Sequence, residues 1–204
     1  MATVVLLGSN NAHKLGEFRA YLEPHGFCVL SPKDLGISLA VEETGRAFAE
    51  NALLKAKAYQ AGSKLITVAD DSGLIVDALN GEPGVYSARY GGAQTSDSDR
   101  TELVLRRLRA VPEPFRTARF IAAIAVVCPT GHAEVFEKTV EGTIAAEPRG
   151  QGGFGYDPIF LYPGMGRTFA EMSTAEKSRV SHRGKALSAV VDYLLSGECD
   201  AIIA

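Results

Sequence analysis

Two adjacent carboxylates, Asp70 and Asp71, are the side chains of this chain whose type and spacing best suit chemistry. They follow the apolar segment 65–69, which we predict to be a buried strand, and they precede Ser72 and Gly73. In α/β proteins the carboxyl ends of parallel strands open onto the ligand crevice, so acids placed there can hold a metal ion or activate a water molecule. Asp, Ser and Gly also favour surface turns, and these four residues alone do not separate the two interpretations.

A second candidate site lies near the N-terminus, where a predicted strand over residues 3–7 ends in Gly8-Ser9-Asn10-Asn11. From Ala12 onward the apolar residues recur with helical spacing, and Lys14 falls in the first turn of that predicted helix. The backbone N–H groups and the positive dipole end of a helix N-terminus favour anions. The Walker A pattern is absent, so the segment is either an ordinary capped turn or a phosphate contact, and Lys14 favours the phosphate.

Two further acids, Glu42 and Glu43, precede a predicted helix over residues 47–61. Acids in this position complement the helix dipole, and they can also supply oxygen ligands to a metal ion. A second short strand is predicted over residues 27–30, between the first helix and these acids. The N-terminal part of the chain therefore alternates strands and helices, which is typical of an α/β sheet.

The middle of the chain has a different pattern. A charged helix is predicted over residues 98–108, and two strands over 118–127 and 133–139 are predicted to form a hairpin. This change from alternating elements to a hairpin predicts a second lobe, with the first site in the cleft between the lobes. The length and composition predict a single domain of two lobes over residues 1–204.

The segment 150–157, GQGGFGYD, is the second unusual stretch. Its glycines allow close approach of the backbone to a ligand, and Phe154 and Tyr156 offer aromatic faces next to Asp157. The alternative is a glycine-rich connecting loop whose aromatic side chains pack into the core.

Three basic residues, Lys177, His182 and Arg183, follow near the starts of two predicted helices, which Ser173 and Ser181 are expected to cap. Such a cluster can neutralise phosphate groups.

The overall charge limits the kind of partner. The formal net charge is −3 and the pI is near 5.8, so we expect no nucleic-acid surface, and any anionic ligand must meet local cations. The three cysteines, Cys28, Cys128 and Cys199, are odd in number and lack C-x-x-C spacing, which predicts reduced thiols rather than a disulfide or zinc site.

The four histidines show no metal-ligand spacing, so any metal ion is expected to be bound by oxygen atoms. The longest apolar run, residues 120–128, is too short to cross a bilayer as a helix, and the N-terminus lacks the pattern of a signal peptide. We therefore expect a cytoplasmic protein with no membrane contact.

These parts together suit a nucleoside triphosphate. An aromatic loop can stack on a base, cations can neutralise phosphates, and carboxylates can hold Mg²⁺, which prefers a few carboxylates together with water and substrate phosphate.

Six blocks of residues, in order between positions 4 and 195, resemble the inosine triphosphate pyrophosphatase family. Its bacterial members are the non-canonical purine NTP pyrophosphatases of the RdgB/HAM1 type. The blocks are Ser9 to Lys14 with Glu17; Glu42 to Gly45 with Asn51, Ala52 and Lys55; Asp70 to Leu74; Pro83 to Arg89; Phe154 to Pro158; and Ser181 to Arg183. One departure is Ser9-Asn10-Asn11 where the family usually has Thr-Gly-Asn, and asparagine is the substitute that best tolerates a left-handed backbone.

The resemblance implies an α/β protein with the ITPase-like (Maf/HAM1) fold, a central mixed sheet with flanking helices and two lobes around a nucleotide cleft. It implies Mg²⁺-dependent hydrolysis of ITP, dITP and XTP to the monophosphate and pyrophosphate by a homodimer. The resemblance further implies that Asp71 is the general base and a metal ligand, assisted by Asp70 and by Glu42 or Glu43. The sequence leaves open which of Glu42 and Glu43 is the metal ligand.

The resemblance also implies substrate contacts. The N-terminal turn, the residue after the acid pair and the cations near the C-terminus would meet the substrate, and the aromatic loop would hold the base, with Phe154 stacked on it. These residues are Ser9, Asn10, Asn11, Ala12, His13, Lys14, Ser72, Phe154, Gly155, Tyr156, Asp157, Lys177, His182 and Arg183.

Base selectivity has a physical basis in this reading. A donor such as Arg183, aimed at the 6-oxo group of hypoxanthine or xanthine, would face another donor in adenine, and an unpaired buried polar group costs about 1–3 kcal/mol. Guanine also carries a 6-oxo group, and the sequence does not show how it is excluded. The alternatives are a Maf-type pyrophosphatase of other specificity, which the FGYD and SHR blocks disfavour, and a nucleotide sensor without turnover, which the full set of acids disfavours.

Overall fold

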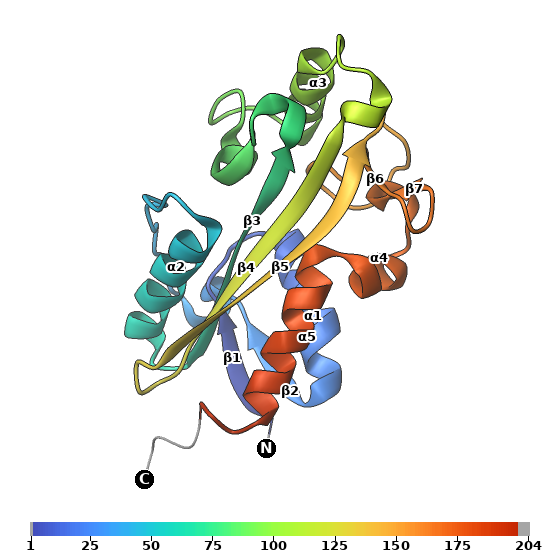
Figure 1. The fold of residues 1–204 in the computed structure, drawn as a ribbon. Coiled ribbons are helices and arrows are strands. Elements are labelled where there is room, and N and C mark those ends of the chain that lie inside the picture. The colour runs from blue at the N-terminus through green and yellow to red at the C-terminus, as the bar shows by residue number, and fades with distance from the viewer. Residues whose placement is uncertain (1, 200–204) are drawn as a thin grey trace. The chain divides into compact units, whose positions relative to one another are not determined.

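The computed structural model describes residues 2–199 and has the expected α/β architecture with a mixed sheet (Figure 1). The sheet has seven strands in the order β2-β1-β3-β4-β5-β6-β7. The strands are β1 (Thr3–Leu7), β2 (Phe27–Leu30), β3 (Ile66–Val76), β4 (Thr117–Val127), β5 (Ala133–Ile144), β6 (Phe160–Tyr162) and β7 (Arg167–Thr168). The α-helices are α1 (Ala12–Leu22), α2 (Phe48–Ser63), α3 (Asp97–Arg107), α4 (Thr174–Val180) and α5 (His182–Leu195). Strand β1 pairs parallel to β2 and β3, whereas β6 pairs antiparallel to β5 and β7.

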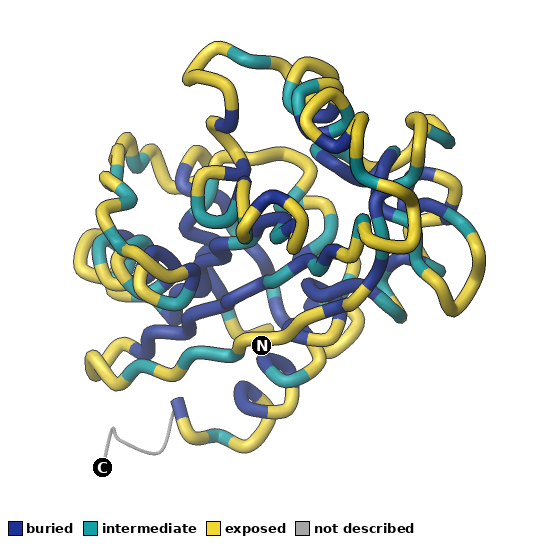
Figure 2. The backbone as a smooth tube through the Cα atoms, turned by 45° about the horizontal axis from the view of Figure 1, so that its top comes forward, coloured by how far each residue is buried: buried dark blue, intermediate teal, exposed yellow. Residues whose placement is uncertain are grey.

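The chain divides into two compact units. Among the described residues, the first unit contains 2–71, 122–138 and 183–199, and the second contains 72–121 and 139–182. Each unit has its own apolar core, and Figure 2 colours the buried residues dark blue and the exposed residues yellow along the backbone. The assignment of residues 1–204 to one domain of two lobes stays a prediction.

The core of the first unit joins the parallel strands to two helices. Phe18 and Leu22 of α1 and the stripe Leu187, Val190 and Leu194 of α5 pack with buried residues of β1, β2, β3 and β4. The i, i+3, i+4 and i+7 spacing of these residues is the reason that each helix has one apolar face.

The core of the second unit is aromatic. The rings of Phe120, Phe160 and Phe169 pack with centroids 4.7 to 5.9 Å apart. Strand β5 and the aromatic strand β6 are in close contact, because a Cβ added at Gly142 would lie 2.5 Å from the Phe160 ring. Val104 of helix α3 and Leu108, directly after the helix, complete this core.

The predicted elements are confirmed where the apolar pattern was clear. The strands predicted over residues 3–7 and 27–30 match β1 and β2, and the predicted helix over 47–61 matches α2 within two residues at each end. Strand β5 extends five residues beyond the predicted segment 133–139. The capping box predicted at Ser173 is present at the start of α4, where its side chain accepts a hydrogen bond from the backbone N–H of Glu176.

The prediction that a strand ends at the acid pair is wrong. Strand β3 runs from Ile66 through Asp70 and Asp71 to Val76, so both acids lie within an extended strand. The neighbouring strand β1 is the one that ends here, because its pairing with β3 stops at Val68. Asp and Gly are disfavoured in strands, and the surrounding sheet overrides that local preference.

The prediction of reduced thiols is also wrong. Cys128, directly after β4, forms a disulfide with Cys199, after α5, with the Cα atoms 5.3 Å apart. The two residues are separated by 71 positions, so no local spacing motif indicates the pair. Cys28 is free, as predicted.

Residues 2–199 contain no helix that is both long and apolar enough to cross a bilayer.

Candidate active site

The acid pair places two carboxylates in different surroundings within the first unit. Successive side chains of a strand point to opposite faces, so Asp70 and Asp71 meet different partners. Asp70 is 1% exposed and contacts Lys14 and Arg183, whereas Asp71 is 7% exposed and contacts Lys55 and Asn51. The difference in partners predicts different protonation behaviour.

Asp70 is held as a carboxylate. The Lys14 Nζ lies 2.5 Å from Asp70 Oδ2, and Arg183 donates from Nε and Nη2 to the two carboxylate oxygens at 3.3 and 3.2 Å. Arg183 also donates from Nη1 to Glu17 Oε2 at 2.5 Å. Burial by itself raises the pKa of Asp70, but Arg183 and Lys14 together outweigh it and hold the pKa well below its usual range. Asp70 therefore anchors two cations and is not available as a base.

Asp71 is the carboxylate with the more basic character. Lys55 Nζ lies 3.0 Å from Asp71 Oδ1, and Asn51 Nδ2 donates to Oδ2 at 3.3 Å. Burial raises the pKa of Asp71 above its ordinary value even though the Lys55 ammonium opposes the shift, and the nearby Glu43 carboxylate adds to it. A raised pKa suits a general base, because it brings proton affinity closer to the working pH.

The acidic segment before α2 brings Glu43 to the same cation. Lys55 Nζ lies 2.6 Å from Glu43 Oε1, so one ammonium group stands between the carboxylates of Glu43 and Asp71. Burial lowers the pKa of Lys55, but Asp71 and Glu43 outweigh burial and raise it. Glu42 is exposed.

The same geometry tests whether Mg²⁺ fits. Among residues 2–199 no three or more Asp, Glu, His or Cys side chains converge as a ready-made metal cluster. However, Glu43 and Asp71 already converge on one cation, the Lys55 ammonium, and they offer the hard oxygen donors that Mg²⁺ prefers. One or two carboxylates with water and phosphate are the usual Mg²⁺ ligands, so the donor set fits the ion.

The N-terminal turn ends in a capped helix. Asn11 is the N-cap of α1, and its Oδ1 accepts hydrogen bonds from the backbone N–H groups of His13 and Lys14 at 2.9 and 3.1 Å. Ser9 Oγ accepts from the N–H of Asn11 at 3.2 Å. Asn10 does not adopt the left-handed backbone conformation. Among the described residues other than glycine, Lys64 and Asn80 adopt it. Asn10, Ala12 and His13 are exposed, and burial lowers the pKa of Lys14 despite its contact with Asp70.

The aromatic loop of the second unit is organised by Asp157. Its Oδ2 accepts a hydrogen bond from the Phe154 backbone N–H at 2.9 Å and one from Lys177 Nζ at 2.6 Å. The Lys177 ammonium also lies 4.7 Å from the centroid of the Phe154 ring, a cation–π contact. Gly153 has φ of +71°, and a Cβ added there would lie 2.0 Å from Asp157 Oδ2, so the loop requires glycine at this position.

The remaining predicted residues of this unit have mixed surroundings. Tyr156 is 4% exposed and donates from its hydroxyl to the Ser87 carbonyl at 2.9 Å, so its ring packs in the core. The backbone N–H of Gly155 donates to Asp97 Oδ2 at 2.6 Å. His182 is buried and stacks on Phe120, with ring centroids 4.6 Å apart. Ser72 lies half-buried in β3.

The structure thus brings the predicted residues together in two groups. In the first unit Lys14, Asp70 and Arg183 form one network, and Asp71 forms another with Glu43. In the second unit Phe154, Asp157 and Lys177 are in mutual contact.

Three residues of the first group received no role from the sequence: Glu17, Asn51 and Lys55. The sequence feature that could have identified two of them is the placement of Asn51 and Lys55, an amide and a cation four residues apart, on the apolar face of a predicted helix. Such residues are rarely buried without a partner.

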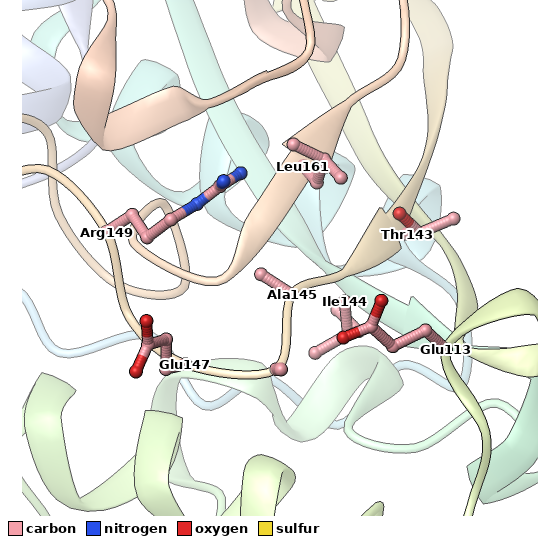
Figure 3. Close-up of a pocket in the computed structure, with 8 residues that line it drawn as sticks. Glu113, Thr143, Ile144, Ala145, Glu147, Arg149 and Leu161 are labelled. Carbon is pink, nitrogen blue, oxygen red and sulfur yellow. The ribbon is translucent and has the colours of Figure 1, made fainter.

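A pocket of about 270 Å³ lies in the second unit, and Figure 3 shows it. None of the predicted site residues lines it, so we do not assign the nucleotide to it. Its lining residues are Glu113, Thr143, Ile144, Ala145, Ala146, Glu147, Arg149 and Leu161.

Taken together, the first group offers a carboxylate with raised pKa, a second carboxylate for a cation, and lysine and arginine side chains. These are the components for activating water beside an anionic phosphate. The second group offers an aromatic ring next to a paired lysine and aspartate, which suits the recognition of a planar base.

Comparison with known proteins gives concordant matches. The model of the Ham1 family matches residues 5–193. A dITP/XTP pyrophosphatase of Thermus thermophilus is 49% identical over 193 residues, which cover 95% of this chain and 92% of the relative. The Ham1 protein of Staphylococcus aureus superposes with a TM-score of 0.85 at 38% identity, covering 96% of this chain and all of the other. A HAM1 protein of Coxiella burnetii superposes with a TM-score of 0.86 at 38% identity, covering 95% of this chain and 99% of the other.

Proposed function

The chain belongs to the Ham1 family, and from this premise we propose that it hydrolyses non-canonical purine nucleoside triphosphates. The substrates are ITP, dITP and XTP, and the products are the nucleoside monophosphate and pyrophosphate. The observation that carries the proposal is the pair of neighbouring carboxylates, Asp70 and Asp71, each in contact with a different lysine, in a chain that matches the Ham1 family over residues 5–193. The opposite directions of their pKa shifts support it. One carboxylate thus holds cations in place, and the neighbouring carboxylate can act as the general base.

Asp71 is the general base of the reaction. A water molecule attacks the α-phosphorus, its proton passes to the Asp71 carboxylate, and the bond from the α-phosphorus to the bridging oxygen breaks, so that pyrophosphate leaves. Burial of Asp71 raises its pKa and so favours this proton transfer. Asp70 stays ionised and keeps Lys14 and Arg183 in place.

Glu43 and Asp71 are the residues that would hold Mg²⁺. When bound, Mg²⁺ supplies charge neutralisation on the phosphate oxygens and acidifies bound water. Glu43 is preferred over Glu42, because its carboxylate already shares a cation with Asp71 whereas Glu42 is exposed to solvent.

The phosphate groups meet a cation and polar groups of the predicted substrate-binding residues. Lys14 and the turn from Ser9 to Lys14 contact the triphosphate, together with Ser72. Because the substrate is highly anionic, these donors contribute mainly by electrostatic stabilisation, as in phosphoryl transfer generally.

The purine base stacks on Phe154, with Asp157 and Lys177 fixing the ring and Gly155, Tyr156 and His182 completing the pocket. Arg183 is the proposed donor to the 6-oxo group. The Arg183 guanidinium donates hydrogen bonds to Asp70 and Glu17. It would donate to the base while it keeps these two contacts.

The protein acts as a homodimer on small nucleotides in the cytoplasm, without binding nucleic acid. The acidic net charge of −3 supports the last point, because non-specific nucleic-acid binding depends on clustered positive charge. The disulfide between Cys128 and Cys199 is the feature that sets this chain apart from the thiol state usual in that compartment.

Hydrolysis of ITP in ¹⁸O-labelled water tests the reaction class. We expect inosine monophosphate and pyrophosphate, with the label in the monophosphate, because water attacks the α-phosphorus. Label in pyrophosphate, or release of the diphosphate and orthophosphate, contradicts the proposed reaction.

A further inference from the structure

We propose that Asn51 is a positioning residue that fixes both the Asp71 carboxylate and the acidic segment that carries Glu43. The inference rests on the proposed function of Asp71 and Glu43 and extends it to a residue that contacts neither substrate nor metal.

The two ends of the Asn51 amide have different partners. Its Nδ2 donates to Asp71 Oδ2 at 3.3 Å, and its Oδ1 accepts from the backbone N–H of Gly45 at 2.8 Å. The side chain is fully buried. An amide is suited to this place because it offers a donor and an acceptor on one planar group without adding charge beside Asp71.

Asn51 is one of three α2 residues that hold the same segment. Asn51, Lys55 and Tyr59 are four residues apart, so they lie along one face of the helix. Lys55 binds Glu43 at 2.6 Å, and the Tyr59 hydroxyl donates to the Leu39 carbonyl at 2.9 Å. Residues 39, 43 and 45 are thus fixed in order along the helix.

The segment depends on these contacts because it has little structure of its own. Between the short 3-10 turn that ends at Leu35 and the start of α2 at Phe48, the described chain has no helix or strand. The N-cap of α2, Ala47, has no side-chain hydrogen bond, and the entry to the helix is held by Glu50, whose Oε2 accepts from the Arg46 backbone N–H at 2.7 Å. Gly45 fits closely against the amide, since a Cβ added there would lie 2.6 Å from Asn51 Oδ1.

A positioning role for Asn51 and a purely structural role predict different experimental results. A residue that only fills the core affects the whole first unit when it is changed, whereas a positioning residue affects the segment 39–45 and the rate of turnover. Asn51→Leu removes both amide contacts at similar volume, and Asn51→Ala removes them without crowding the core. Gln60→Leu is the matched control, because Gln60 is an amide on the same helix that binds the Pro129 carbonyl outside the segment.

The experiment combines hydrogen–deuterium exchange of the free protein with steady-state kinetics on ITP at saturating Mg²⁺. For Asn51→Leu and Asn51→Ala we expect at least tenfold faster exchange confined to residues 39–45. We also expect kcat to fall by about 10- to 100-fold, as for other residues that orient active-site ligands, with KM within threefold. Gln60→Leu is expected to match the wild type in both readouts.

The inference is wrong if either readout stays within twofold of the wild type in the Asn51 variant that folds. If Asn51→Leu fails to fold, Asn51→Ala decides, and Tyr59→Phe gives a second measurement, with faster exchange expected around residue 39. A wild-type protein that does not turn over ITP or XTP refutes the proposed function, whereas the exchange of residues 39–45 still tests the positioning.

Discussion

Removal of the Cys128–Cys199 disulfide should lower the stability of the protein by a calculable amount. The bond closes a loop across 71 positions, and in the chain-entropy model a loop of that length restricts the unfolded chain by about 4 kcal/mol. For a protein of this size each kcal/mol shifts the melting temperature by roughly 2–4 °C. We therefore expect reduction to lower the melting temperature by about 8–16 °C.

The assay compares oxidised protein with protein that has been reduced in denaturant and refolded with a phosphine reductant present. Reduction through unfolding is necessary because Cys128 and Cys199 are 0% and 2% exposed. Mass spectrometry counts the thiols, and differential scanning calorimetry gives the melting temperature. Cys28→Ala is the matched control, because Cys28 is free and its variant should respond to reduction like the wild type.

Two results would refute this reasoning. One is the detection of three titratable thiols in the denatured, unreduced protein, which would mean that the bond does not form. The other is a melting temperature that changes by less than about 2 °C on verified reduction, which would mean that the loop closure contributes little to stability.

Three further predictions concern the site. Asp71→Asn should lower kcat by at least about 100-fold, the usual contribution of a general base, while a fluorescent ITP analogue still binds within a few-fold of wild type; undiminished turnover would remove Asp71 as the base. Glu176→Gln should destabilise the protein much more at pH 7 than at pH 2, because hydrogen bonds from Arg167 and then Ser173 lower the folded pKa of Glu176 to about 2. Its contribution is therefore fully present above the ordinary value of 4.5 and is lost as the pH falls from there towards 2, so a difference independent of pH in thermal melts would contradict it. Gly153→Ala should lower the free energy of unfolding by at least about 1 kcal/mol in urea titrations, because it forces a left-handed alanine against Asp157; unchanged stability would contradict the assigned geometry.

The sequence predicted the elements whose local pattern and tertiary role agree. β-Branched runs identified β1 and β2, and regular apolar spacing identified α1 and α2. The family resemblance carried by the ordered blocks is confirmed by the Ham1 match over residues 5–193.

The sequence failed where long-range packing overrides local preference. Residues of the acid pair have turn propensity, yet the sheet holds them in the middle of β3. The disulfide joins residues 71 positions apart, and only the fold brings the end of α5 to the end of β4.

The candidate site was predicted in part for the same reason. Lys14, Asp70 and Asp71 could be identified from the sequence as candidate functional groups. Which lysine or arginine pairs with which carboxylate depends on the folded structure, and the sequence spacing does not predict it. Asn51 and Lys55 resembled ordinary members of a helix face until their partners Asp71 and Glu43 were placed.

The central claim is the choice of substrate. The most direct test is a panel of ITP, dITP, XTP, ATP and GTP with the wild-type protein and Mg²⁺, in which kcat/KM is measured and the products are identified. We predict that the three non-canonical nucleotides yield monophosphate and pyrophosphate with kcat/KM at least about tenfold above that for ATP and GTP. Equal kcat/KM for all five nucleotides, or no turnover of any, would contradict it.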